Sequence, residues 1–102
     1  MNIEFGNRHL LELYEQGKCS KYRIDRSILR KFFMRVQSLE AAKDIYDLWQ
    51  TPSLNFEKLT GFSNRYSIRL QDKWRLEFEI NPSDDSKTCS SIRIIELSNH
   101  YR

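Results

Sequence analysis

Hydrophobic positions recur at two different periods along the chain, and the change of period divides it into two halves. Before Pro52 the apolar residues return every three to four positions, which is the spacing of an amphipathic helix. After Pro52 they alternate with polar residues, which is the spacing of a strand with one buried face. This order predicts an α+β fold, with N-terminal helices packed on one face of an antiparallel sheet.

The helical half is expected to begin with a short strand at 1–5 and to contain two main helices. Asn7 is placed to cap the first helix, and Gly17 is placed to end it. Asp25 is placed to cap the second. The apolar face of the second helix consists of Ile28, Leu29, Phe32, Phe33, Val36 and Leu39. A shorter helical stretch follows and is ended by Pro52, because proline cannot continue a helix.

In the strand half, two strictly alternating segments predict a β-hairpin. The residues on its inward face are Tyr66, Ile68, Leu70, Trp74, Leu76, Phe78 and Ile80. Those on its outward face are Ser67, Arg69, Arg75, Glu77 and Glu79. A short strand is expected at 56–59 and a last one at 91–97. Helices must cover the apolar face, so the polar face is left to solvent or a ligand.

Chain length and composition indicate a single compact domain. With 102 residues the chain is long enough for one core and too short for two, so we expect one domain over residues 1–102. No apolar run approaches the roughly 20 residues that cross a bilayer. The N-terminus also lacks the apolar segment of a signal peptide. We therefore expect a cytoplasmic protein that has no contact with membranes.

Positive charge is concentrated between Lys18 and Arg35. This segment holds seven lysines and arginines against one aspartate, while the whole chain carries a formal charge of only +3. The remainder of the chain is therefore net acidic. Such a localised positive region is typical of proteins that bind a polyanion, and the alternative is a solvated helix face.

Metal and cofactor chemistry have little support in the sequence. The chain has no CxxC pair, no Cys/His cluster, no glycine-rich phosphate loop and no nucleophile elbow, so we expect neither a metal nor a cofactor. The arginines of the polar face remain. A planar guanidinium suits a phosphate through two parallel hydrogen bonds. The alternative is cross-strand pairing of Arg69 or Arg75 with a glutamate of the same face.

Three segments of the strand half carry a specific motif. They are Leu59-Thr60-Gly61, the strand Tyr66–Leu70 with its Ser-Ile-Arg core, and Asp72–Phe78, in which Trp-Arg follows a turn. Together with the last strand and the tail Asn99-His100-Tyr101, they resemble RelE/HigB-type toxins of the RelE/ParE superfamily. The motif covers about Phe56–Tyr101, and the helical half matches only in pattern. The resemblance implies a RelE-like, microbial ribonuclease-like fold.

The resemblance also implies a function. Such toxins of type II toxin-antitoxin systems are ribosome-dependent mRNA endonucleases, or mRNA interferases. They cut by metal-independent attack of a ribose 2′-OH on the phosphodiester, and so inhibit translation. The implied partners are a cognate HigA-like helix-turn-helix antitoxin, the ribosome and mRNA, with operator DNA contacted only through the antitoxin. One alternative is a non-enzymatic ParE-like toxin that poisons gyrase, and another is a catalytically silent RNA-binding module.

By the same resemblance, the catalytic residues would be Arg75, His100, Tyr101 and Lys58. Arg75 matches the arginine that follows tryptophan in the family, and it would stabilise charge on the reacting phosphate. His100 would act as acid or base, and Tyr101 would stack on a nucleobase or orient the sugar. Lys58 is a second candidate base.

Two carboxylates are further candidates for the base. Glu57 stands where many HigB-like toxins have a histidine, and Glu96 is an alternative counterpart of an aspartate near their C-terminus. RNA-binding roles are implied for Arg65, Arg69, Lys73, Arg93, Arg26, Arg30 and Lys31. Of these, Arg65 and Arg69 would hold phosphates flanking the one that is cut. Arg26, Arg30 and Lys31 belong to the basic segment, whose concentrated charge predicts contact with ribosomal RNA, and the alternative is that this helix face receives the antitoxin.

Overall fold

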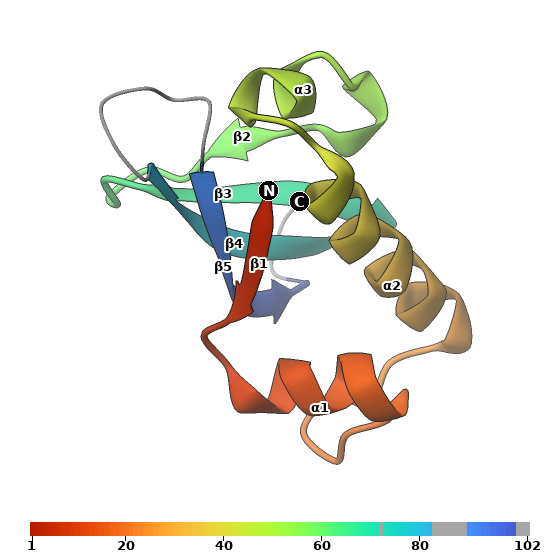
Figure 1. Cartoon of the computed structure of the whole chain (residues 1–102). Coiled ribbons are helices and arrows are strands. Elements are labelled where there is room, and N and C mark those ends of the chain that lie inside the picture. The colour runs from red at the N-terminus through yellow and green to blue at the C-terminus, as the bar shows by residue number, and fades with distance from the viewer. Residues whose placement is uncertain (72, 83–89, 100–102) are drawn as a thin grey trace.

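A five-stranded sheet with helices on one face forms the protein, as seen in the computed structural model, which describes residues 1–71, 73–82 and 90–99 (Figure 1). The elements are β1 (Asn2–Phe5), α1 (Arg8–Gln16), α2 (Arg26–Ala41), α3 (Ile45–Trp49), the 3-10 helix η1 (Pro52–Leu54), β2 (Glu57–Lys58), β3 (Arg65–Gln71), β4 (Trp74–Pro82) and β5 (Ser90–Ser98). The strand order is β1-β5-β4-β3-β2. The predicted α+β arrangement is confirmed, and β1 adds to it by pairing in parallel with β5.

Local sequence signals account for most of the helix ends. The Asn7 side chain accepts a hydrogen bond from the His9 amide at 2.9 Å, and Gly17 ends α1 with φ at +76°, a conformation that glycine adopts without penalty. The helix α2 begins after Asp25, although that side chain makes no capping hydrogen bond. The helix α3 ends at Trp49, so Pro52 opens the following 3-10 helix instead of ending α3 itself.

The core lies between the helices and the apolar face of the sheet. Its helical members are Leu10, Leu13, Ile28, Phe32, Val36, Leu39 and Leu48. Its main sheet members are Ile68, Leu70, Leu76, Phe78, Ile80, Ile92, Ile94 and Leu97. The core residues of α2 recur and those of β3 and β4 alternate as the sequence predicts, while in β5 a register shift places Ile94 and Leu97 three residues apart on the same face. The other face of the sheet is left polar. Among the described helices, none has the length and apolar content to cross a membrane.

The strand register arranges the polar face in three transverse rows. The first consists of Glu4, Arg93, Glu79 and Arg65, in which the charges alternate. The second consists of Glu96, Glu77, Ser67 and Glu57. The third consists of Ser98, Arg75 and Arg69. Along β3 and β4, adjacent rows are two residues, or about 7 Å, apart, whereas a register shift in the pairing of β4 with β5 places Arg93 and Glu96 three residues apart. The face therefore has carboxylates across its middle and arginines at one end, which we call the arginine end.

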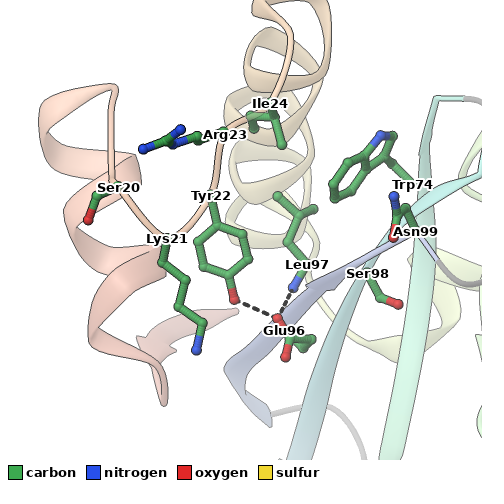
Figure 2. A pocket seen from close by; sticks show the side chains of 10 residues that line it. All are labelled: Ser20, Lys21, Tyr22, Arg23, Ile24, Trp74, Glu96, Leu97, Ser98 and Asn99. Carbon is green, nitrogen blue, oxygen red and sulfur yellow. Dashed lines mark hydrogen bonds between the residues drawn. The ribbon is translucent and has the colours of Figure 1, made fainter.

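The link between α1 and α2 is tied to the end of β5 by Tyr22 and Glu96 (Figure 2). The Tyr22 hydroxyl donates to Oε1 of Glu96 at 2.5 Å, and the Leu97 amide donates to the same oxygen at 3.0 Å. Nδ2 of Asn7 donates to the Tyr22 hydroxyl at 3.1 Å. Burial, with the hydrogen bond and the negative charge of Glu96, raises the pKa of Tyr22 well above its usual range. Glu96 therefore has a structural role, because its carboxylate accepts the hydrogen bond that links Tyr22 to β5.

Replacing Tyr22 by phenylalanine is expected to lower the free energy of unfolding at neutral pH by about 1–2 kcal/mol, the contribution of a half-buried hydrogen bond to a charged group. Because the folded state raises the pKa of Tyr22, its contribution is complete below the usual tyrosine value of about 10 and is lost as the pH rises above it. Urea unfolding at neutral and alkaline pH measures both effects. The control is Tyr46→Phe on α3, where the side chain is exposed. An equal loss in both variants, or no change with pH, would contradict this account.

Candidate functional site

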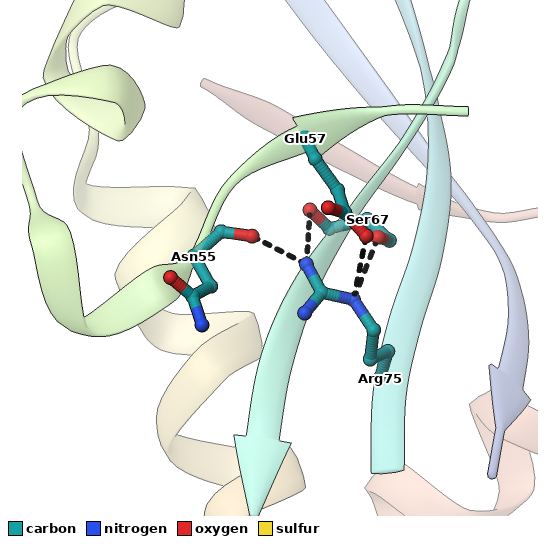
Figure 3. Close-up of polar contacts among 4 residues, drawn as sticks. All are labelled: Asn55, Glu57, Ser67 and Arg75. Carbon is teal, nitrogen blue, oxygen red and sulfur yellow. Dashed lines mark hydrogen bonds and ion pairs between the residues drawn. The ribbon is translucent and has the colours of Figure 1, made fainter. Parts of the chain in front are cut away.

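Arg75 joins the arginine end of the polar face to the row of carboxylates (Figure 3). Nε of Arg75 donates to Oγ of Ser67 at 2.9 Å and lies 3.5 Å from Oε1 of Glu57. A terminal nitrogen of the same guanidinium donates to the backbone oxygen of Asn55. Arg75 is only 7% exposed, whereas the side chain of Glu57 is 52% exposed. The result is a fixed, buried guanidinium beside an accessible carboxylate.

Local sequence explains how this pair is assembled. Asn55 follows η1 with φ at +46°, in the left-handed region that asparagine tolerates better than most residues. Its backbone oxygen then meets Arg75, and the chain enters β2 with Glu57 directly opposite Ser67. Ser67 is small and fully buried, so the guanidinium can lie over it. The roles of Asn55 and Ser67 were missed from the sequence, where the one signal was a small residue between two arginines on an outward face.

The pair has the two properties that phosphodiester cleavage demands. A carboxylate near the substrate can accept a proton from an attacking hydroxyl. A cation whose position is fixed in advance can stabilise the charge that develops on a phosphate, since no reorganisation is needed at the moment of reaction. Glu57 and Arg75 supply these two groups within 3.5 Å of each other. Within the described ranges, no group of three or more His, Cys, Asp or Glu side chains is arranged to hold a metal ion.

Two of the predicted RNA-binding cations lie close to Arg75. Arg69 is its direct cross-strand partner and is exposed. Lys73 is exposed in the turn that leads into β4. On α2, Arg26 and Arg30 are exposed and Lys31 is half-buried. Arg35, which was not among the predicted RNA-binding residues, also reaches the arginine end, where its Nε donates to the backbone oxygen of Arg69 at 2.9 Å.

Arg65 and Arg93 lie at the opposite end of the polar face. Arg65 is four residues from Arg69 along β3, a separation of about 13 Å. It forms an ion pair of 3.5 Å with Glu79 and stacks on the Phe62 ring at 4.3 Å. Arg93 is exposed in the same row of alternating charges. Arg65 is therefore held by a cross-strand ion pair of the kind that was considered for Arg69 and Arg75, and the structure does not bring Arg65 or Arg93 together with Arg75.

Lys58 is separated from Arg75 by the sheet itself. Successive residues of a strand point to opposite faces, and Glu57 is on the face of Arg75. Lys58 pairs with Tyr66, and the cross-strand partner of Tyr66 on β4 is Phe78, which lies in the core beneath the helices. The register thus places Lys58 on the face opposite Arg75 and makes Glu57 the candidate base beside Arg75, and a catalytic role for Lys58 stays a prediction.

Glu96 is also distant from the pair. It shares a row with Glu57, but three strand spacings, or about 14 Å, separate β5 from β2. The side chain of Arg75 extends toward β2, where it meets Glu57 and Asn55, and not toward Glu96. His100 and Tyr101 lie outside the described residues, so their predicted roles stay predictions.

Comparison with known proteins identifies the family. The family model of the HigB-like toxin, a RelE-like toxin of type II toxin-antitoxin systems, matches residues 3–94. No curated protein resembles the chain closely enough in sequence to count as a match.

Two solved structures share the fold. One is a YoeB/ParE toxin from Agrobacterium tumefaciens, with a TM-score of 0.55 and 17% identity, over 99% of this chain and 100% of that one. The other is a YoeB dimer from Staphylococcus aureus, with a TM-score of 0.55 and 21% identity, over 99% of this chain and 98% of that one. The fold, the polar face and the family match agree, and the chain belongs to the HigB-like family of RelE-like toxins from type II toxin-antitoxin systems.

Proposed function

We propose that this toxin is a ribosome-dependent mRNA endonuclease whose active site is built on Glu57 and Arg75. The observation that carries the proposal is the ion pair between an accessible carboxylate and a buried guanidinium, on a sheet face with further arginines at one end. The toxin family is established by the sequence match over residues 3–94, and the reaction is inferred from the chemistry of this pair.

In the proposed reaction, the 2′-hydroxyl of a ribose attacks the adjacent phosphorus and gives its proton to the Glu57 carboxylate. Arg75 stabilises the negative charge that accumulates on the non-bridging oxygens. The bond from phosphorus to the 5′-oxygen then breaks, leaving a 2′,3′-cyclic phosphate on one fragment and a 5′-hydroxyl on the other. The leaving oxygen needs a proton from an acid, a role that we propose for His100, with Tyr101 orienting the nucleotide. No step of this proposed reaction requires a metal ion.

The direct test is to add the purified toxin to ribosomes stalled on a defined mRNA and to map the ends of the fragments. We expect cuts within the decoding region, with cyclic phosphate and 5′-hydroxyl ends, and little cleavage of the same mRNA without ribosomes. DNA breaks that depend on gyrase, together with intact mRNA, would reverse the proposal and support the ParE-like alternative.

The partners follow from the family and from the surface charge. A type II toxin has an antitoxin, which we propose to be HigA-like and to provide the only contact with operator DNA. The ribosome as target places the toxin in the cytoplasm.

We further propose that exposed Arg26 and Arg30 contact ribosomal RNA. Charge reversal at both should then weaken ribosome binding and lower its salt dependence. Loss of antitoxin binding instead, with ribosome binding unchanged, would assign this surface to the antitoxin.

A further inference from the structure

Two cations of α2 lie along the end of β3 that extends beyond its pairing with β2. Nε of Arg35 donates to the backbone oxygen of Arg69 at 2.9 Å, and Nε2 of Gln71 donates to Oγ of Ser27 at 3.3 Å. These two contacts fix one side of α2 against β3. Lys31 is on that same side, because it is four residues from both Ser27 and Arg35. The helix therefore presents Lys31 and Arg35 to the strand that carries Arg69.

Arg35 and Arg69 lie close together, and neither has a carboxylate partner within 4.0 Å among the residues that the structure describes. Burial and the positive charge of Arg69 both lower the pKa of Arg35. Holding like charges together and partly away from water is unfavourable unless an anion is shared between them. Among the described residues, the positive charges of Arg35 and Arg69 are therefore not compensated by a carboxylate, and this arrangement suits a bound anion.

The location of this cluster identifies the anion. Arg69 is the direct cross-strand partner of Arg75, so the cluster adjoins the proposed catalytic pair. The side chain of Arg75 is buried toward Asn55 and Glu57, whereas Arg69 is exposed. A polynucleotide with one phosphate at Arg75 would thus meet a second cationic position next to it. Guanidinium groups also match phosphate oxygens in geometry, since each can donate two parallel hydrogen bonds.

We propose that Lys31, Arg35 and Arg69 form a second anion site, which binds a backbone phosphate of single-stranded RNA beside the phosphate that is cut. This inference deepens the proposed function and rests on it for the identity of the RNA. It gives Arg35 a role in holding the substrate in register. It also assigns Lys31 to the binding of substrate RNA instead of ribosomal RNA.

The test uses a short single-stranded RNA in which every ribose carries a 2′-O-methyl group, so that binding is measured without cleavage. Affinity is followed by fluorescence anisotropy over a series of salt concentrations. Arg35→Gln is expected to weaken binding about tenfold, as for the loss of one charge-assisted hydrogen bond. It should also reduce the slope of log K against log salt by about 0.7, the value for one phosphate contact on a single strand.

A double variant examines whether the two arginines share one phosphate. Arg69→Gln should match Arg35→Gln in affinity and slope, and the double variant should lose little more slope than either single one, because only one contact is removed. Arg69→Gln keeps the backbone oxygen that accepts the hydrogen bond from Arg35, so it removes a charge from the site without removing that contact. If Arg35→Gln folds poorly, Arg69→Gln therefore still tests the proposed site. Arg35→Lys should retain the slope. The matched control is Arg8→Gln, an exposed arginine on α1.

Three results would overturn the inference. They are failure of the wild-type toxin to bind this RNA at low salt, equal binding by Arg35→Gln and Arg8→Gln, and Arg35-dependent binding of polyglutamate without Arg35-dependent binding of RNA. The third would assign the site to an acidic protein segment. Arg35-dependent RNA binding by a toxin that cuts no mRNA would leave the anion site standing and remove only the proposed reaction.

Discussion

Replacing Arg75 by glutamine is expected to lower the rate of ribosome-dependent mRNA cleavage by about two to three orders of magnitude. The guanidinium is held in place by Ser67, Glu57 and Asn55, so its charge is positioned before the substrate arrives. Glutamine can still donate to Ser67, but it carries no charge to stabilise the transition state. Single-turnover cleavage on programmed ribosomes measures the effect.

Arg75 is buried, so folding must be checked in parallel by circular dichroism and urea unfolding. Arg75→Lys keeps the charge but loses the planar fork, and we expect it to recover only part of the rate. Arg8→Gln on α1 removes an exposed arginine and should cleave as the wild type does. A folded Arg75→Gln toxin that cuts mRNA at the wild-type rate would exclude Arg75 from the mechanism.

Replacing Glu57 by glutamine is expected to lower the cleavage rate by about two to four orders of magnitude, the usual contribution of a general base. The substitution preserves the size of an exposed side chain, so the fold should be unaffected. Binding of the 2′-O-methyl RNA should be retained, because only a negative charge is removed from the site. The loss should therefore fall on the chemical step and not on affinity.

Glu96→Gln is the control that separates the two candidate carboxylates. Because Glu96 accepts from Tyr22 and lies across the sheet from Arg75, we expect this variant to lose stability and to retain its cleavage rate. The reverse outcome, with cleavage lost in Glu96→Gln and kept in Glu57→Gln, would move the active site toward β5.

Strict alternation between 66 and 80 predicted the hairpin, and helical spacing between 28 and 39 predicted α2, since both patterns reflect a single buried face. The partner of β1 was not predictable, because a short alternating segment does not specify which strand it joins. The choice between Lys58 and Glu57 as candidate bases stayed open for a similar reason. In a two-residue strand, the face of each side chain is set by its pairing with β3, which only the fold reveals.

Arg35 was missed for a related reason. Helical spacing shows that Arg35 shares a side with Lys31, but it does not show which neighbouring strand that side meets. Asn55 was missed because its contribution is made by a backbone oxygen, which leaves no trace in the residue type. The residues that the sequence identified best were those whose side chains alternate in long strands.

The parallel pairing of β1 with β5 has a consequence for synthesis of the chain. Asn2 and Ser91 are partners, and β5 stands between β1 and β4 in the sheet. While a ribosome is still translating the preceding residues, β1 has no strand beside it and β4 has one open edge. Contacts between such distant segments form slowly, and unpaired edges recruit other strands. The nascent toxin therefore remains an incomplete sheet until β5 emerges. This strand pairs directly with β4, where Ser98 is the partner of Arg75, so its arrival completes the sheet that positions the proposed catalytic pair.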